Sequence, residues 1–152
     1  MAVLYNLDHT LSVGIYFFED FNDKEWIKYE IIVESESHFG SPIVFNEETA
    51  NTYLYLENFI EPEVPELVQK LDDLCRGTIE YMIFQPIDER DFKLEIHMTG
   101  DSAKVELLLE LVPDPETYSF YTNKNELAKF AAQMEKEYGE LISGKHALLV
   151  CE

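Results

Sequence analysis

The segment that most constrains the fold is residues 92–111, where apolar and polar side chains alternate in two successive runs. In the first run every second residue from Phe92 to Met98 is apolar, and the second run repeats the pattern after a Thr-Gly-Asp-Ser turn at 99–102. A period of two on either side of a glycine-containing turn is typical of an antiparallel hairpin with one buried face. We therefore predict such a hairpin, with Leu108 partly covered on its more polar face.

Other segments have the composition of strands. Residues 13–18 and 26–34 are apolar or alternating runs separated by an acidic turn, which predicts a second hairpin. The polar stretch before them, residues 6–10, carries no strand pattern. Further strands are predicted at residues 52–57, 78–85 and 117–121.

Two segments have helical periodicity. In the first, Pro62 and Pro65 stand at the start, apolar residues recur every three or four positions, and Gly77 suits the left-handed position that ends a helix. The second is predicted to begin with a capping pair, Asn123 and Glu126. It would bury Leu127, Phe130, Ala131, Met134, Tyr138 and Leu141, end at Ser143-Gly144, and leave residues 146–152 as a short strand or a loose tail.

This order of elements predicts an α+β fold: a largely antiparallel sheet of about six to seven strands with two main helices packed against one face. The chain shows no repeat, linker or shift in composition, so residues 1–152 are predicted to form a single domain. Residues 1–10 and 143–152 are the ends that could attach loosely.

Net charge is the most unusual property of the chain. It has 11 lysine and arginine residues against 31 aspartate and glutamate residues, a formal net charge of −20. Such an excess repels nucleic acid and anionic membranes and attracts basic partners, although it also serves solubility alone. No apolar run approaches the ~20 residues that span a bilayer, the first residues lack a basic segment, and Cys75 and Cys151 form no metal or redox spacing. We expect a cytoplasmic protein.

Catalytic motifs are not apparent. The histidines have no metal-binding spacing, and the chain contains no nucleophile elbow, phosphate loop or Cys-x-x-Cys. We therefore expect no enzymatic activity, no cofactor and no metal. Because 31 acids produce chance pairs, a small hydrolase using paired carboxylates stays open as an alternative. The aromatic clusters at 16–18 and 118–121 are interpreted as parts of strands whose alternate residues enter the core, with core packing favoured over a binding pocket. Trp26, on the more polar face of its strand, is interpreted as a binding anchor.

Several of these features together resemble the WapI-family immunity proteins, small bacterial partners of polymorphic toxins. The tryptophan-led strand at 26–31, the leucine-rich helix ending in Gly77, the glycine-turn hairpin at 94–107 and the aromatic strand at 118–120 before Leu127 are similar to the family's order. Asn123-Lys124 departs from the acidic residue and glutamine usual at the last helix entry. The resemblance implies a protein that binds and neutralises a cognate toxin domain.

Charge and resemblance lead to the same functional hypothesis. Toxins that act on nucleic acids are generally basic, so a chain of charge −20 would be steered onto such a surface and occlude it. A DNA-mimic inhibitor of a nucleic-acid-binding protein is the other alternative. The predicted partner-binding residues, chosen by charge density in loops, are Glu19, Asp20, Asp23, Glu25, Trp26, Asp88, Glu89 and Asp91.

Overall fold

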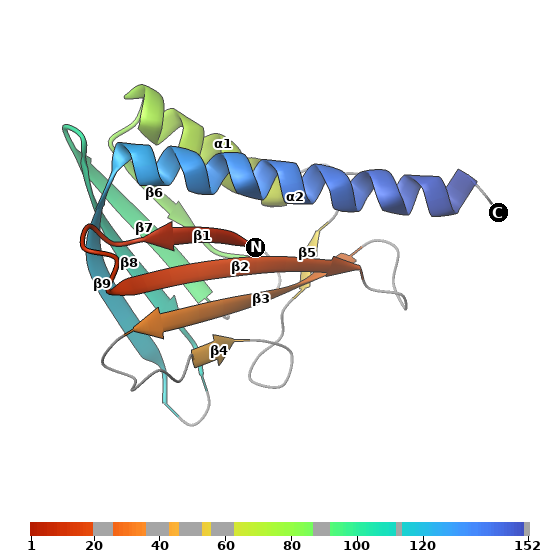
Figure 1. Ribbon diagram of the computed structural model, residues 1–152, viewed down its shortest axis with the longest axis horizontal. Helices are drawn as coiled ribbons and strands as arrows, with labels where there is room; N and C mark the ends of the chain where they lie inside the picture. Colours follow the sequence, from red (N-terminus) through yellow and green to blue (C-terminus); the bar gives the residue numbers. More distant parts are fainter. Residues whose placement is uncertain are drawn as a thin grey trace.

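The computed structural model describes residues 1–19, 26–35, 43–45, 53–55, 63–86, 92–111 and 114–150. Within these residues the chain forms two antiparallel sheets and two α-helices (Figure 1), which confirms the predicted α+β class. The first sheet has the order β1-β2-β3-β4, with β5 also paired to β3. Its strands are β1 (Ala2–Tyr5), β2 (Leu11–Glu19), β3 (Trp26–Ser35), β4 (Ile43–Phe45) and β5 (Tyr53–Tyr55).

The second sheet is a meander in which each strand pairs with the next, in the order β6-β7-β8-β9. The predicted central hairpin is confirmed as β7 and β8, with a register that runs from Phe92 opposite Leu109 to Thr99 opposite Ser102. Leu108 is half-buried, as expected. The strands of this sheet are β6 (Tyr81–Phe84), β7 (Phe92–Thr99), β8 (Ser102–Leu109) and β9 (Glu116–Asn123).

The two helices are α1 (Glu63–Arg76) and α2 (Lys124–Val150). Gly77 follows α1 with a φ of 76°, in the left-handed region predicted for it. At the start of α2 the Asn123 side-chain oxygen accepts a hydrogen bond from the Glu126 amide at 2.9 Å, which confirms the predicted cap. Neither of these two helices has the length and apolar character needed to cross a membrane.

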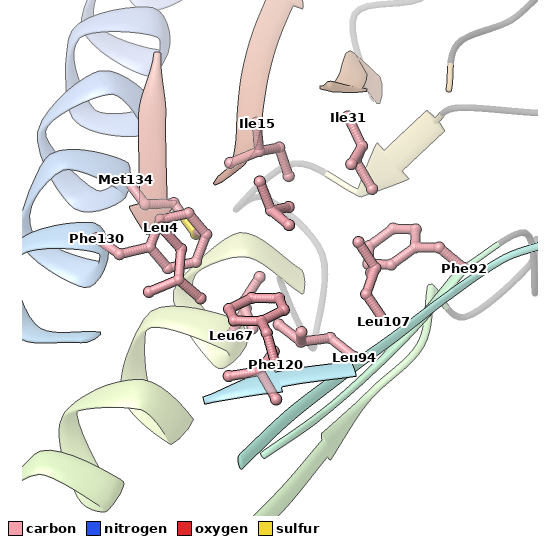
Figure 2. Close-up of a pocket in the computed structure, with 12 residues that line it drawn as sticks. Leu4, Ile15, Ile31, Leu67, Phe92, Leu94, Leu107, Phe120, Phe130 and Met134 are labelled. Carbon is pink, nitrogen blue, oxygen red and sulfur yellow. The ribbon is translucent and has the colours of Figure 1, made fainter. Parts of the chain in front are cut away.

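The core lies where the inner faces of both sheets meet the two helices. Buried apolar residues from both sheets and both helices belong to one continuous cluster. At its centre is a cavity of about 20 Å³ lined only by apolar side chains (Figure 2). The lining residues labelled there are Leu4, Ile15, Ile31, Leu67, Phe92, Leu94, Leu107, Phe120, Phe130 and Met134.

The predicted single sheet needs correction, and the predicted packing of the helices is not confirmed. The strands divide between two sheets instead of forming one. Alternation marks an inner and an outer face for each strand, but it is the same whether the inner face meets a helix or another sheet. Packing of both helices on one sheet face is not confirmed either, because α1 contacts β5 and β6 while α2 contacts β1, β2 and β9.

The predicted end of the second helix is wrong. Helix α2 continues through Ser143 and Gly144 to Val150, so most of the tail predicted at 146–152 is helical. An interior glycine costs only about 1 kcal/mol relative to alanine, and the buried Ile142 side chain holds this part of α2 against the core. Leu141 is half-buried instead of buried.

The N-terminal strand β1 and the short strand β4 are not among the strands that the sequence patterns predict. Residues 1–10, suggested as a loose end, include β1, whose Ala2 and Leu4 side chains are buried. The Met1 ammonium pairs with Glu137 of α2. The described part of the strand predicted at 52–57 is strand β5, and the rest of that segment lies outside the described residues.

Candidate functional site

Most of the predicted partner-binding residues lie outside the described part of the chain. These are Asp20, Asp23, Glu25, Asp88, Glu89 and Asp91. Glu19 and Trp26 are described through their strands: Glu19 ends β2 opposite Ile27, and Trp26 begins β3 opposite Tyr55. The two predicted acidic segments therefore follow directly from strands whose positions are known.

The strands that flank the two acidic segments belong to different sheets. Residues 20–25 connect β2 to β3 in the first sheet, and residues 87–91 connect β6 to β7 in the second. The start of β7 lies at the same sheet end as the start of β9, because Phe92 pairs with Leu109 and Leu109 with Glu116. In Figure 1 the end of β2 is at the right of the molecule and the start of β9 is at the lower left. The described strands therefore assign the two segments to different sheets, and the segments themselves lie outside the described residues.

Beside the first acidic segment, the outward positions of β2 and β3 form a small aromatic surface. Tyr16 and Phe18 point outward and are 38% and 40% exposed, and their rings stack with centroids 5.9 Å apart. Across the hairpin Tyr16 pairs with Glu30, and Phe18 pairs with Lys28. The Glu30 and Lys28 side chains are half-buried. We call Tyr16, Phe18, Lys28 and Glu30 the hairpin patch.

Strand alternation contained the signal for the hairpin patch, but the predicted partner-binding residues did not include Tyr16 and Phe18. Val13 and Ile15 are buried, and strand alternation then directs Phe17 inward and Tyr16 and Phe18 outward. The expected alternation of the 16–18 cluster is therefore confirmed, with Phe17 packed against the core and its two neighbours exposed. Exposed aromatic side chains next to charged residues are common anchors in protein interfaces.

The second aromatic cluster divides in the same way. Tyr118 and Phe120 are buried, whereas Tyr121 is 58% exposed on the outer face of the second sheet. Burial raises the pKa of the Tyr118 phenol, with the Glu116 carboxylate adding to the effect, so this hydroxyl stays neutral at physiological pH. The 118–121 segment therefore contributes one exposed aromatic side chain to a surface distant from the hairpin patch.

Several described lysines already have acidic partners. A hydrogen bond from Lys93 to Glu95 raises the pKa of that lysine, which stays charged. Exposed ion pairs add little to stability, but each one leaves a lysine less available to neutralise other carboxylates. The ion pairs are Lys70–Glu66 at 3.1 Å, Lys93–Glu95 at 2.9 Å, Lys104–Glu106 at 3.4 Å, Lys124–Asp101 at 3.4 Å and Lys129–Glu126 at 3.9 Å.

Other carboxylates gather at one end of the second sheet. Glu110, Asp114 and Glu116 are all exposed around the end of β8 and the start of β9. The connection that carries Asp88, Glu89 and Asp91 begins and ends at the same end of this sheet, by the meander topology. This is a second acidic region, separate from the hairpin patch.

The described cavities do not resemble an active site. The central cavity is entirely apolar. An open depression of about 530 Å³ lies between the end of α1 and the start of α2, lined by Cys75, Asp101, Asn123, Lys124, Asn125 and Ala128. Burial and the nearby Asp72 raise the pKa of the Cys75 thiol, which makes it a poor nucleophile at neutral pH. Asp101 is the one carboxylate in this lining, so neither cavity offers the acid pair that a hydrolase needs.

In the described part of the chain no group of three or more histidine, cysteine, aspartate or glutamate side chains is arranged to hold a metal ion. The candidate site is therefore a surface, the hairpin patch, and not a pocket.

Comparison with known proteins adds no relative. A scan against protein-family models, a search of curated proteins and a search of solved structures each found no match. The likeness to WapI-family immunity proteins therefore depends on the sequence features alone.

Proposed function

We propose that this protein is a non-enzymatic inhibitor that binds a basic toxin domain and neutralises it by covering its surface. The hairpin patch and the adjoining acidic segment, with Glu19, Asp20, Asp23, Glu25 and Trp26, form the proposed contact. The acidic end of the second sheet, next to Asp88, Glu89 and Asp91, contributes to long-range attraction.

The observation that carries the proposal is the uncompensated negative charge. The chain has 20 more acidic than basic residues, and five of its 11 basic side chains are already in described ion pairs with carboxylates. The remaining cations are too few to neutralise the other acids within the chain. A cationic partner would lower this electrostatic free energy and would be drawn to the protein from a distance.

The hairpin patch supplies aromatic anchors, which electrostatic attraction alone does not provide. Electrostatic attraction speeds encounter, whereas tight binding usually depends on a few desolvated aromatic anchors surrounded by a polar rim. Tyr16 and Phe18 are exposed on a paired strand, so little backbone entropy is lost when they are covered. Glu19 follows immediately, at the beginning of the acidic segment.

The DNA-mimic alternative predicts carboxylates at regular, phosphate-like spacing along one face. On the outer face of the second sheet, lysines alternate with glutamates and pair with them, as in Lys93–Glu95 and Lys104–Glu106. That face does not imitate a phosphate backbone. The inhibitor proposal needs no such regularity.

Growth rescue tests the proposal. The tagged protein would be used to capture partners from its source cell, and each captured basic domain would be expressed in a heterologous host with and without this chain. We expect one basic domain to arrest growth and co-expression of this chain to restore it. Failure to recover any basic toxic domain, or arrest that co-expression leaves unchanged, would contradict the proposal.

A further inference from the structure

The outer face of the second sheet carries two neighbouring rows of opposite charge. Cross-strand register places Tyr81, His97, Lys104 and Tyr121 side by side across β6 to β9, and we call this the lysine row. Two residues further along each strand, the register places Ile83, Glu95, Glu106 and Ser119 side by side, and we call this the glutamate row.

The two rows expose large apolar side chains. Tyr81 and Ile83 are exposed on β6, Tyr121 is exposed on β9, and the Tyr81 ring lies 4.5 Å from the His97 ring, centroid to centroid. The inward neighbours of these residues, such as Met82, belong to the core, so strand alternation keeps the rows on the outside. A face with three exposed large apolar residues suits a protein partner better than bulk water.

The edges of this sheet are less available than its face. On β6, the Lys70 ammonium donates a hydrogen bond to the Ile83 carbonyl at 2.8 Å. On β9, the Tyr121 carbonyl accepts one from the Leu7 amide at 3.0 Å. Occupied carbonyls and an edge lysine obstruct strand addition at these positions. Face-to-face contact is therefore the favoured mode of association.

Local charge balance determines which partner fits the face. Two copies of a chain of charge −20 repel each other over most of their surfaces. The two rows and the adjoining Lys93 form an exception, because Lys104 pairs with Glu106 at 3.4 Å and Lys93 pairs with Glu95 at 2.9 Å. With Lys93 included, this face of each copy carries two lysines and two glutamates, so contact between copies through it brings no excess of negative charge together.

We propose that this face is the interface of a symmetric dimer, with a second copy of the chain as the partner. A two-fold axis that runs across the strands, midway between the rows, lays each row on the other row of the partner. Lys104 then faces Glu106 of the partner subunit, and His97 faces Glu95 of the partner subunit. Tyr81 meets Ile83 of the partner subunit, so charge and apolar contacts match at the same time.

Charge-reversal variants studied by sedimentation equilibrium test this dimer. We expect the wild-type chain to have the mass of two copies, and K104E and E106K each to raise the dimer dissociation constant at least about tenfold, because like charges then face each other. The double variant K104E/E106K restores opposite charges across the axis and should restore the dimer. K129E, on the exposed surface of α2, changes net charge as much as K104E and should have little effect.

The charge-reversal variants distinguish the proposed interface from a general effect of net charge. E106K lowers the net negative charge, so general repulsion predicts tighter association, whereas the proposed interface predicts weaker association. Circular dichroism of each variant checks that these exposed positions leave the fold intact. A monomeric wild-type chain, a dimer that neither single variant weakens, or a double variant that stays monomeric would overturn the proposal.

Discussion

The outer faces of the two sheets are built by the same strand alternation but differ in chemistry. On the first sheet, Tyr16 and Phe18 stand exposed immediately before a carboxylate-rich segment. On the second, lysines and glutamates lie in adjacent rows and pair with one another, as Lys104 and Glu106 do. Alternation decides which residues enter the core, whereas cross-strand register decides whether surface charge is balanced or left open. We therefore propose a basic partner for the outer face of the first sheet and a second copy of the chain for that of the second.

The largest expected effect comes from the core that supports both faces. Phe120 is buried beside residues of both sheets and both helices (Figure 2). We expect Phe120→Ala to lower the free energy of unfolding by about 3–5 kcal/mol, because it removes a large side chain and enlarges the cavity. Urea denaturation at low protein concentration measures this, with Tyr121→Ala as the exposed aromatic control, expected to change stability by less than about 1 kcal/mol. Equal effects of the two variants would show that Phe120 does not belong to this core.

The next largest effect is on binding of the cognate basic domain, which we expect to depend on the outer face of the first sheet. Phe18→Ala should weaken binding of the cognate basic domain by about 2 kcal/mol, or about thirtyfold, with little change in stability, since it removes an exposed anchor. Tyr5→Ala is the matched control, because Tyr5 is 37% exposed at the far end of the same sheet. Isothermal titration calorimetry would measure both. If Tyr5→Ala costs as much affinity as Phe18→Ala, the contact is not centred on the hairpin patch.

A smaller effect on stability is expected at Gly77, in the connection between α1 and the second sheet. Gly77 has a φ of 76°, so Gly77→Ala should reduce stability by about 1–2 kcal/mol through strain in the left-handed region. Gly139 lies within α2 with open space around it, and Gly139→Ala should instead stabilise by about 0.5–1 kcal/mol. Thermal denaturation should show a lower melting temperature for Gly77→Ala and a higher one for Gly139→Ala than for the wild-type chain. Destabilisation by both variants would contradict this expectation.

The sequence predicts local structure well where a single physical rule dominates. The 92–111 hairpin follows from alternation, the end of α1 from Gly77, and the start of α2 from the Asn123 cap. Each of these depends on residues close together in the chain. Division into two sheets depends instead on what each inner face meets, which alternation does not encode. The continuation of α2 through Gly144 likewise depends on tertiary packing of Ile142.

The candidate surface was predictable in part. Composition identifies the charge, and the phase of alternation set by Val13 and Ile15 was sufficient to place Tyr16 and Phe18 outside. The two rows on the second sheet required the register of four strands, which a sequence pattern does not specify. Charge density alone selected two acidic segments that belong to different sheets.

The salt dependence of association with the cognate basic domain tests the central claim most directly. The claim is that open negative charge on this protein steers it onto a cationic surface. Stopped-flow measurements from low to high sodium chloride should show an association rate that falls steeply with ionic strength, while the dissociation rate changes little. An association rate that is insensitive to salt, or that rises with it, would contradict the account.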